Sequence, residues 1–400
     1  RYIGKGKIGL IDNRDITTGK AMYGLDTRLD GMLYALIARP PVYGGKVKSV
    51  DDSEAMKVAG VVKIFTIDAP EIPSEFQPVG GVAVVAKNTW AAMKAREALK
   101  ITWDDGPNAT YDSVAFRGEL EKAARAPGKV VRDQGDVAGA MAKAKTKLEA
   151  EYFVPHLVQA PMEPPAATVR IKDGFCEAWA NTQAPQATHD RLAKKLNLPA
   201  DKVKVNVTLL GGGFGRKSKP DYVVEAALCS QAMDGQPVKL VWTREDDMAA
   251  GYYRPQVHHT VKAGLNEKGQ ITGWRHTMVG KSIMIGSPFE AMLVKNGVDS
   301  TSIEGASDTP YALPAYRFEV HNAREGVPVL WWRSVGHTHT AQAMEVFIDE
   351  LAHAAGADPV AYRLGLLGGA PRLSATLKLA AEKAGWDPKK GADKNRDKNR

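Results

Sequence analysis

Cysteine is nearly absent from this sequence, which holds only Cys176 and Cys229 among 400 residues. Two thiols cannot supply the four ligands of an iron–sulfur cluster or of a structural zinc site. Both cysteines lie in apolar stretches that are typical of buried elements, so a disulfide between them is possible but not indicated. The sequence therefore excludes these two kinds of cysteine-held metal site within the chain.

Long apolar runs are missing as well, because no stretch approaches the ~18–20 residues that span a bilayer. No segment combines a basic face with spaced aromatic residues, so we expect no nucleic-acid binding despite the formal charge of +8. The densest basic cluster lies in the repetitive tail 388–400, which we expect to be solvated. The chain opens with Arg1 and shows no export signal, so either its start has been removed or it is part of a longer product. The sequence does not indicate a cellular compartment.

The remaining composition is typical of globular proteins, with 44% hydrophobic and 25% charged residues. Four hundred residues exceed what one hydrophobic core usually serves, so we expect at least two domains. The strand and helix patterns predict an α+β fold in three parts: a compact α+β unit over 1–107, a helical linker over 108–145, and a second α+β domain over 146–387.

Two local patterns make specific structural predictions. Residues 88–100, NTWAAMKAREALK, predict an amphipathic helix with Trp90, Met93 and Leu99 on its apolar face. Residues 257–279 alternate as two strands and predict a long hairpin that turns at Asn266–Gly269.

A glycine-rich stretch, LLGGGFGRKSKPD over residues 209–221, follows a predicted strand. It differs from the phosphate-loop pattern G-x-x-x-x-G-K-[ST] only where Arg216 replaces the last glycine, and Arg216 also breaks the dinucleotide pattern G-x-G-x-x-G. Proline is favoured in the first turn of a helix and excluded from its interior, so the next helix should start near Pro220 rather than at Lys217. This displacement argues against a nucleotide-binding loop.

Two interpretations of the glycines then stay open. Consecutive glycines can simply let a strand bend beneath a packed helix. Alternatively, Phe214 between Gly213 and Gly215 is an aromatic anchor that fixes the loop while its backbone N–H groups face a ligand.

Several ordered motifs together resemble one family. They are TLLGGGFGRK (208–217), NTQAPQ (181–186), PMEP (162–165), VWTREDDM (241–248) and WWRSVGH (331–337). The chain resembles the large, molybdopterin-binding subunit of the xanthine oxidase family, in particular bacterial isoquinoline 1-oxidoreductase beta subunits and related membrane-linked aldehyde dehydrogenases. The resemblance implies that 1–107 is an α/β hammerhead domain and that 146–387 is the first of two molybdopterin-binding domains.

The resemblance also implies a cofactor and partners. The cofactor is a molybdopterin, expected in its cytosine dinucleotide form, whose dithiolene supplies the sulfur ligands of the molybdenum, so the protein contributes hydrogen bonds and close backbone approach instead. Electrons are expected to leave through [2Fe–2S] clusters on a small partner subunit, and in some relatives onward to cytochrome c.

Site residues are carried over from the family's motifs one by one. Gln183 matches a glutamine whose amide donates to an oxygen ligand of the metal. The glycine loop that lies against those ligands corresponds here to Gly212, Gly213, Phe214, Gly215 and Arg216. Arg333 and Gly336 match a second loop that contacts pterin and substrate, and Ser334 departs from the glycine that is usual there.

One expected residue is missing, because the family's general base is a glutamate in a G-x-G-E loop that this chain does not contain. The chain therefore resembles the middle of a longer large subunit whose C-terminal part completes the site, with aldehydes or N-heteroaromatic compounds as substrates. Ser218 stands where xanthine-oxidising relatives carry glutamate, so purines are less expected. The alternative is a non-catalytic fragment or binding module with an incomplete cofactor site.

Three polar residues near these motifs have alternative structural roles. Gln183 could cap the helix that begins at Pro185. Glu163 is favoured as a buried carboxylate that orients a loop rather than as a catalytic group. Arg244 and Glu245 could form a surface ion pair or brace the pocket.

Aromatic and histidine residues receive structural interpretations. Trp331 and Trp332 are expected mainly in the core. His337 and His339 form an H-x-H pair without a third metal ligand at compatible spacing, so a metal site there is not favoured. His258 and His259 should point to opposite faces of a strand.

Overall fold

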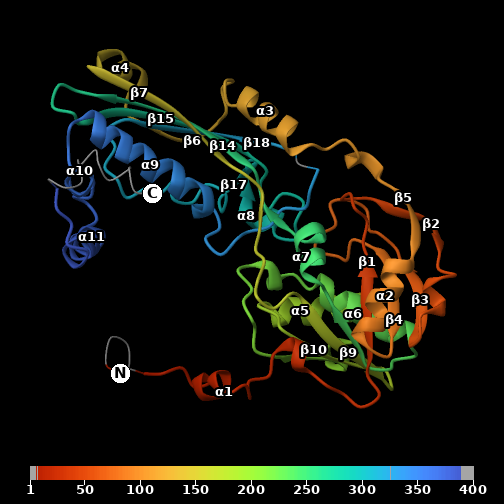
Figure 1. Cartoon of the computed structure of the whole chain (residues 1–400). Helices are drawn as coiled ribbons and strands as arrows, with labels where there is room; N and C mark the ends of the chain where they lie inside the picture. Colours follow the sequence, from red (N-terminus) through yellow and green to blue (C-terminus); the bar gives the residue numbers. More distant parts are fainter. Residues whose placement is uncertain (1–5, 7, 325, 389–400) are drawn as a thin grey trace, which may run out of the picture. The chain divides into compact units, whose positions relative to one another are not determined.

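The computed structural model describes residues 6, 8–324 and 326–388, so residues 389–400 of the predicted basic tail lie outside the described residues. The chain forms two compact units that interleave along the sequence (Figure 1). The first unit comprises Arg1–Thr110, Val158–Tyr253 and Gly326–Leu330. The second comprises Tyr111–Leu157, Arg254–Glu325 and Trp331–Arg400. Helices and strands alternate in both, which confirms the predicted mixed α+β class.

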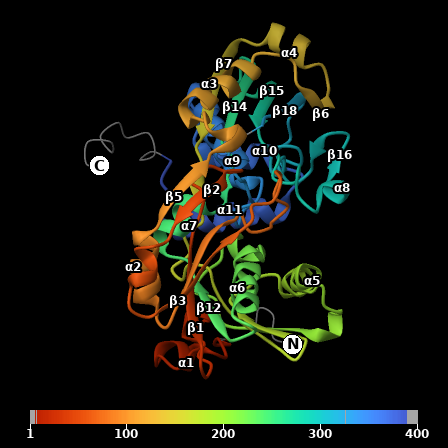
Figure 2. The ribbon, with the colours of Figure 1, turned by 90° about the vertical axis from the view of Figure 1, so that its right-hand side faces the viewer.

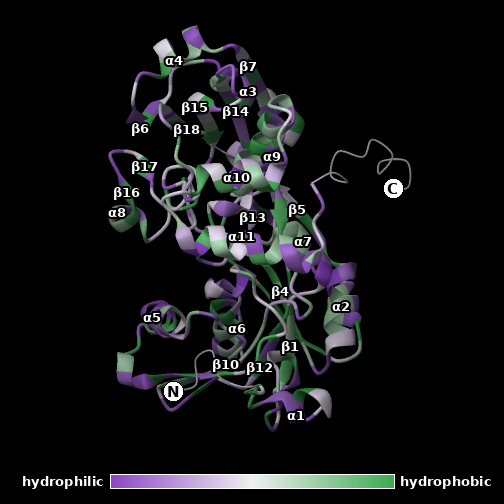
Figure 3. Ribbon diagram, turned by 90° about the vertical axis from the view of Figure 1, so that its left-hand side faces the viewer, coloured by the Kyte–Doolittle hydropathy of each residue, from purple (hydrophilic) through white to green (hydrophobic). Residues whose placement is uncertain are grey.

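A seven-stranded mixed sheet organises the first unit. Its strands, in spatial order, are β11 (Val203–Val207), β10 (Phe175–Ala180), β9 (Ala166–Lys172), β12 (Val238–Val241), β1 (Leu33–Ala38), β4 (Gly81–Ala86) and β3 (Val61–Ile67). The pairs β1/β12 and β10/β11 are parallel, and the other pairs are antiparallel. Figure 3 shows hydrophobic residues concentrated along β1, β4 and β12 in the middle of this sheet.

Helices cover both faces of the sheet, which explains why β4 is buried along its whole length. Successive strand residues point to opposite faces, so Ala83 and Val85 pack with α6 (Asp221–Ala232) and Val84 and Ala86 pack with α2 (Thr89–Ala98). Figure 2 shows α2 and α6 on opposite sides of the strands.

The helix α2 is capped as its sequence predicts, because the Asn88 side chain accepts a hydrogen bond from the backbone of Ala91 at 2.8 Å. The predicted apolar face is confirmed for Met93 and Leu99, which pack against the core cluster beneath the helix, and it is wrong for Trp90. The residues that it buries are Ala91, Ala92 and Ala95, whereas Trp90 is 66% exposed. Small side chains let the helix lie close to the strands.

The smaller elements of the first unit lie around this sheet. They are α1 (Asn13–Thr17), α5 (Pro185–Leu196), α7 (Arg244–Ala250) and the two-stranded ribbon of β2 (Lys46–Asp51) and β5 (Lys100–Asp104).

The second unit contains a five-stranded sheet. Its order is β6 (Lys129–Gln134), β18 (Tyr316–Asn322), β15 (Ile271–Gly280), β14 (Val257–Leu265) and β7 (Thr146–Val154). The β14–β15 hairpin turns as predicted, since Asn266 accepts a backbone hydrogen bond from Gly269 at 3.0 Å and Gly269 has a φ of 72°. Short strand pairs and one turn of helix, α8 (Glu290–Leu293), lie in the following loops.

Helices also cover both faces of this second sheet (Figure 1). The long helix α9 (His337–Ala354) packs Phe347 against Trp274, with ring centroids 5.0 Å apart. On the other face, α3 (Ser113–Ala123) contacts Val279, and α4 (Val137–Lys143) lies over Gly264 and Gly273. The helices α10 (Pro359–Leu366) and α11 (Pro371–Lys383) follow α9.

The compact units do not follow the predicted ranges. The range 1–107 lies wholly within the first unit, whereas 146–387 contributes to both units. The range 108–145, which we expected to be a helical linker, contains α3 and α4 but also the edge strand β6, so it is an integral part of the second unit. Among the described residues, no helix combines the length and the apolar character needed to cross a bilayer.

Candidate functional site

The glycine loop joins β11 to α6 in the first unit. It passes through Gly211–Gly215, makes a short 3₁₀ turn over Arg216–Ser218, and enters α6 at Asp221 with Pro220 as the N-cap. The predicted helix start near Pro220 is therefore confirmed. Lys217 is fully buried and pairs with Glu163, so it cannot reach a phosphate as a phosphate-loop lysine does. The nucleotide-binding alternative is excluded.

Three successive backbone N–H groups of this loop have no hydrogen-bond partner among the residues that the structure describes. They belong to Gly212, Gly213 and Phe214. The next two are satisfied, since Gly215 donates to Gln183 and Arg216 donates to the carbonyl of Gly213. Buried backbone donors are almost always paired, and Gly213 is buried. Three successive free donors of this kind could bind a ligand that carries oxygen or anionic acceptors.

The loop's backbone is held in an unusual conformation. Phe214 has a φ of 53° and Gly215 a φ of 104°, both in the left-handed region. This conformation costs ~1–2 kcal/mol at a non-glycine residue, and it persists where surrounding contacts over-determine it. The side chain of Phe214 is 38% exposed, and its ring lies beside Gly212, where an added Cβ would be 3.1 Å from it. The role of Phe214 as an aromatic anchor stays a prediction.

Glu163 binds the beginning and the end of the glycine loop with one buried carboxylate. Its Oε2 accepts hydrogen bonds from the backbone N–H of Gly211 at 2.9 Å and from Nζ of Lys217 at 3.1 Å. Its Oε1 accepts one from the backbone N–H of Leu25 at 3.0 Å. The expected role of Glu163 as a satisfied carboxylate that orients a loop is confirmed.

Gln183 touches the middle of the same loop. Its Oε1 accepts a hydrogen bond from the N–H of Gly215 at 3.1 Å, and its own backbone N–H donates to the carbonyl of Lys217 at 2.9 Å. The alternative helix-capping role was wrong, because α5 has Ala184 at its N-cap and no side-chain cap. Since the oxygen is engaged, Nε2 is left as the outward donor. It has no partner within the described part of the chain, and the side chain is exposed.

The buried anchors of the loop are cations that the sequence did not single out for this role. Arg216, Lys217 and Lys219 are each at most 1% exposed. The Arg216 guanidinium pairs in a bidentate manner with Asp221, at 2.9 and 2.7 Å. Burial by itself would lower the pKa of Arg216, but the Asp221 carboxylate outweighs it and raises that pKa.

The two lysines are more strongly affected by desolvation. Burial lowers the pKa of Lys217 despite its pairing with Glu163. Burial likewise lowers the pKa of Lys219 to about 6, and its Nζ lies 3.3 Å from the centroid of the Phe76 ring. Buried charged groups of this kind fix the conformation of the loop more than they stabilise the fold, because the cost of removing them from water offsets much of their attraction to the paired carboxylates.

The second predicted loop, with Arg333, Ser334 and Gly336, lies in the second unit at the start of α9. Arg333 and Ser334 are exposed, and neither has a side-chain partner in the described ranges. Gly336 is buried against the turn 301–304, where an added Cβ would lie 2.4 Å from the carbonyl oxygen of Thr301. The structure thus gathers Gln183 and Gly212–Arg216 in one unit and places the second loop in the other.

The remaining candidate residues each had two alternative roles, and the structure distinguishes them. Arg244 does brace the neighbourhood, since it pairs with the buried Asp247 at 2.8 Å and donates to the carbonyl of Pro161, whereas Glu245 is exposed and does not pair with it. The core assignment of Trp331 and Trp332 was wrong, because both are only partly buried.

The histidines form a hydrogen-bonded chain in the second unit. His259 bonds through Nδ1 to His276 at 2.8 Å and through Nε2 to His339 at 3.2 Å, while His258 points to the other face, as predicted, near Glu151. Burial lowers the pKa of His276 and His339 to about 3 and that of His259 well below its ordinary value. No group of three or more His, Cys, Asp or Glu in the described residues has the arrangement of a metal site.

Fold and loop together define a mixed α+β domain with a glycine loop whose backbone N–H groups at Gly212, Gly213 and Phe214 have no partner in the described part of the chain. The chain matches the molybdopterin cofactor-binding domain over residues 122–365, and it belongs to that family. The resemblance noted from the sequence motifs is thereby confirmed.

Individual relatives agree with this assignment. The chain is 32% identical to a membrane-bound aldehyde dehydrogenase [pyrroloquinoline-quinone] of Gluconacetobacter polyoxogenes, over 96% of this chain and 52% of that protein. It is 31% identical to the isoquinoline 1-oxidoreductase subunit beta of Brevundimonas diminuta, over 92% of this chain and 47% of that one. The fold is similar to that of quinoline 2-oxidoreductase from Pseudomonas putida 86, with a TM-score of 0.72 at 20% identity over 94% of this chain and 53% of that chain. The chain spans about half the length of these relatives.

Proposed function

We propose that the glycine loop binds a molybdenum-carrying molybdopterin. The observation that carries this proposal is the row of three unpartnered N–H groups at Gly212, Gly213 and Phe214, backed by Gln183, in a chain of the molybdopterin-binding family. Such donors suit the oxygen ligands of a metal whose sulfur ligands come from its own cofactor. When bound, that cofactor supplies the redox centre at which a substrate is oxidised.

The residues around the loop fit this group. A side chain at position 213 would occupy the space beside Gln183, since an added Cβ would lie 2.3 Å from its Oε1. Because that oxygen is fixed by Gly215, Nε2 of Gln183 is oriented to donate toward the same ligand. The buried guanidinium of Arg216 pairs with Asp221 and so holds the end of the loop. In this proposal it does not contact the ligand. In this proposal Gln183 is therefore the residue that contacts the reacting centre.

We further propose that the loop over residues 333–336 supplies donors to the cofactor or substrate. We assign this role to the exposed Arg333 and Ser334, with Gly336 setting the close packing of the backbone. The general base is expected from a part of the protein beyond this chain, since no glycine-flanked glutamate of the G-x-G-E type occurs in it.

The complete protein is proposed to be a molybdenum hydroxylase or dehydrogenase that oxidises aldehydes or N-heteroaromatic compounds. The names of the two relatives, an aldehyde dehydrogenase and an isoquinoline oxidoreductase, support this substrate class. The finer proposals are the cytosine dinucleotide form of the cofactor, a small [2Fe–2S] partner subunit with cytochrome c as a further acceptor, and a hammerhead domain over 1–107.

Metal analysis of the longer natural protein, purified from cells that make the cofactor, tests this proposal. About one molybdenum per chain is expected. Gly213→Val should abolish retention of the metal, because the branched side chain fills the space in front of Gln183. Gly118→Ala is the matched control, since its added Cβ meets nothing within 4 Å. Wild-type protein free of molybdenum, or full retention in Gly213→Val, would overturn the proposal.

A further inference from the structure

Two guanidinium groups lie over the ring of one buried tryptophan behind the glycine loop. The Cζ of Arg216 is 4.9 Å and the Cζ of Arg39 is 3.7 Å from the ring centroid of Trp242, which is 1% exposed. Cations attracted to an aromatic face gain most where water is excluded. Trp242 directly follows the central strand β12, so the sheet fixes the position of its backbone.

Arg39 and Trp242 are tied together by a shared carboxylate. Glu225 on α6 accepts hydrogen bonds from Nε and Nη2 of Arg39, at 3.1 and 2.5 Å, and from Nε1 of Trp242, at 2.8 Å. The side chains of Arg39 and Glu225 are 2% and 1% exposed. The indole is therefore held at its edge and over its face by groups from two other elements.

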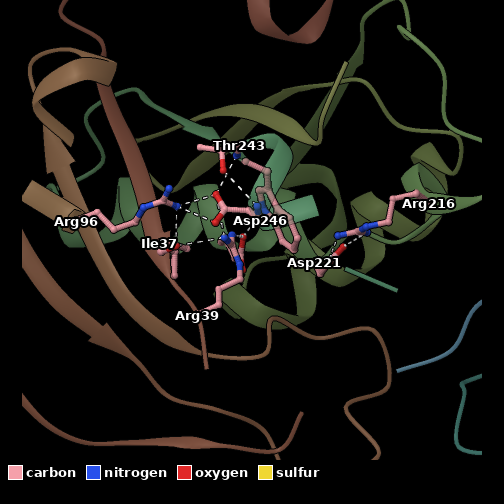
Figure 4. A network of polar contacts seen from close by, with 9 residues as sticks. Ile37, Arg39, Arg96, Arg216, Asp221, Thr243 and Asp246 are labelled. Carbon is pink, nitrogen blue, oxygen red and sulfur yellow. Dashed lines mark hydrogen bonds and ion pairs between the residues drawn. The ribbon is translucent and has the colours of Figure 1, made fainter. Parts of the chain in front are cut away.

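The network continues away from the loop, as Figure 4 shows. Asp246 lies between Arg96 and Arg39. It accepts hydrogen bonds from Arg96 at 2.8 and 2.7 Å and lies 3.9 Å from Arg39. The backbone N–H of Thr243, the residue after Trp242, also donates to Asp246 at 2.9 Å. Residues of the range 1–107 thus brace the strand end that carries Trp242.

Arg216 has contacts within its own segment and outside it, and the charge of Asp247 on α7 also acts on it. Its strongest partner, Asp221, is in the same loop-to-helix segment and moves with it, as does Tyr222, whose ring is 5.9 Å away. Among the described residues, Trp242 and Tyr252 are the rings around Arg216 that belong to other segments. Of these two, Trp242 is hydrogen-bonded to Glu225.

We propose that Trp242, held by Arg39 and Glu225, is a positioning residue that sets the conformation of the glycine loop. The inference rests on the proposed function, because it concerns how the loop presents its N–H groups to the cofactor. Arg216 follows Gly215 directly, and its N–H donates to the carbonyl of Gly213 at 2.9 Å. Displacement of its guanidinium from Trp242 is transmitted to the backbone between Gly213 and Gly215.

Limited trypsin digestion of the chain without cofactor measures this effect directly. Arg216 and Lys217 are two tryptic sites that the native loop buries, whereas trypsin does not cleave after Lys219, because Pro220 follows it. In Trp242→Leu, cleavage at these two sites should accelerate about tenfold or more relative to exposed sites, because cleavage of a buried site tracks local opening. Trp242→Phe, which keeps the ring but loses the hydrogen bond to Glu225, should give an intermediate rate.

Trp179→Leu is the matched control. Trp179 lies on β10 of the same sheet with Arg170 5.8 Å from its ring, and it is outside the network. Should Trp242→Leu not fold, Arg39→Lys takes its place, because it keeps the charge while it loses the fork on Glu225. An unchanged pattern, or faster cleavage spread evenly along the chain, would overturn the inference and leave Trp242 a core residue.

A second measurement separates this inference from the proposed function. In the longer protein made with cofactor, Trp242→Leu should retain less molybdenum than wild type and Trp179→Leu the same amount. Absence of molybdenum from wild type refutes the proposed function, while the digestion result still decides whether Trp242 positions the loop. Normal molybdenum content in a Trp242→Leu protein with an undisturbed loop refutes the positioning role alone.

Discussion

The side-chain oxygen of Gln183 accepts a hydrogen bond from the backbone N–H of Gly215, and the same oxygen occupies the space where Gly213 would carry a Cβ. Gly213→Ala should therefore push the Gln183 side chain outward and break this hydrogen bond. Gln183→Ala breaks the same bond from the other side. We expect each variant to lose ~0.5–1.5 kcal/mol of unfolding free energy, the value of one hydrogen bond, in urea denaturation.

The double variant distinguishes this coupling from two independent losses. Because both substitutions remove one interaction, their effects should not add, and Gly213→Ala with Gln183→Ala should cost about as much as one alone. Additive losses would show that Gly213 is constrained by something other than Gln183. In the longer protein, molybdenum content should fall in both single variants.

Replacing one partner of the Glu163–Lys217 pair is expected to lower the free energy of unfolding strongly. Glu163→Gln leaves a buried ammonium without its counter-charge, and such losses are typically ~3–5 kcal/mol. The loss should shrink as the pH rises, because burial already lowers the pKa of Lys217 and its neutral form carries no unpaired charge. Urea denaturation at pH 7 and pH 9 measures both effects.

Two variants control this prediction. Adding Lys217→Met to Glu163→Gln should restore part of the stability, since it removes the stranded charge. Glu97→Gln breaks the exposed pair with Lys94, at 2.6 Å, and should change stability by less than ~0.5 kcal/mol. A loss in Glu163→Gln no larger than in Glu97→Gln would contradict the role of Glu163 as the loop's fastening.

Local chemistry made several features predictable from the sequence. Pro220 fixed the start of α6, since proline is tolerated only at a helix beginning. The alternating pattern on either side of Asn266–Gly269 fixed the hairpin, because its period is that of a strand. The predicted role of Glu163 was also right, since a carboxylate between prolines and apolar residues needs donors when it is buried.

Burial of individual side chains could not be predicted in the same way. Trp90 was placed on the apolar face of α2, yet it is 66% exposed, and the residues that the helix buries fully are alanines. An aromatic anchor at Phe214 was one of two open interpretations of the glycine loop. Phe214 is 38% exposed, whereas Arg216 and Lys217 are buried. The run RKSK, residues 216–219, gives no local sign that Arg216, Lys217 and Lys219 are buried. Its acidic partners, Glu163 and Asp221, lie 54 and 5 positions from the residues that they bind, and only the fold pairs them.

The chain of histidines in the second unit predicts a pH dependence of stability. His259, His276 and His339 have pKa values that burial lowers far below ~6.5, the value expected in the unfolded chain. As the pH falls below ~6.5, the three histidines take up protons in the unfolded state but stay neutral in the folded state. The free energy of unfolding therefore decreases until about pH 3, where the folded state is protonated as well. Each histidine contributes a slope of up to ~1.4 kcal/mol per pH unit.

Variants isolate this contribution from that of other titrating groups. His339→Gln should reduce the slope of unfolding free energy against pH between 6.5 and 4.5, whatever it does to stability at neutral pH. His353→Gln removes an exposed histidine of the same helix and should leave the slope unchanged. Equal slopes in wild type and both variants would mean that the buried chain does not resist protonation.

Val335 holds a strained backbone beside Arg333, with a φ of 49° in the left-handed region. A β-branched residue is a genuine outlier there, whereas asparagine tolerates this conformation. Val335→Asn should therefore raise the unfolding free energy by up to ~1 kcal/mol, despite the loss of some apolar contact. Val346→Asn, at a 40% exposed position in the regular part of α9, lacks this relief and should be neutral or destabilising. If the strain shapes the loop for its ligand, the stabilised Val335→Asn protein should retain less molybdenum than wild type. A gain of stability with unchanged molybdenum content would show that the strain has no such role.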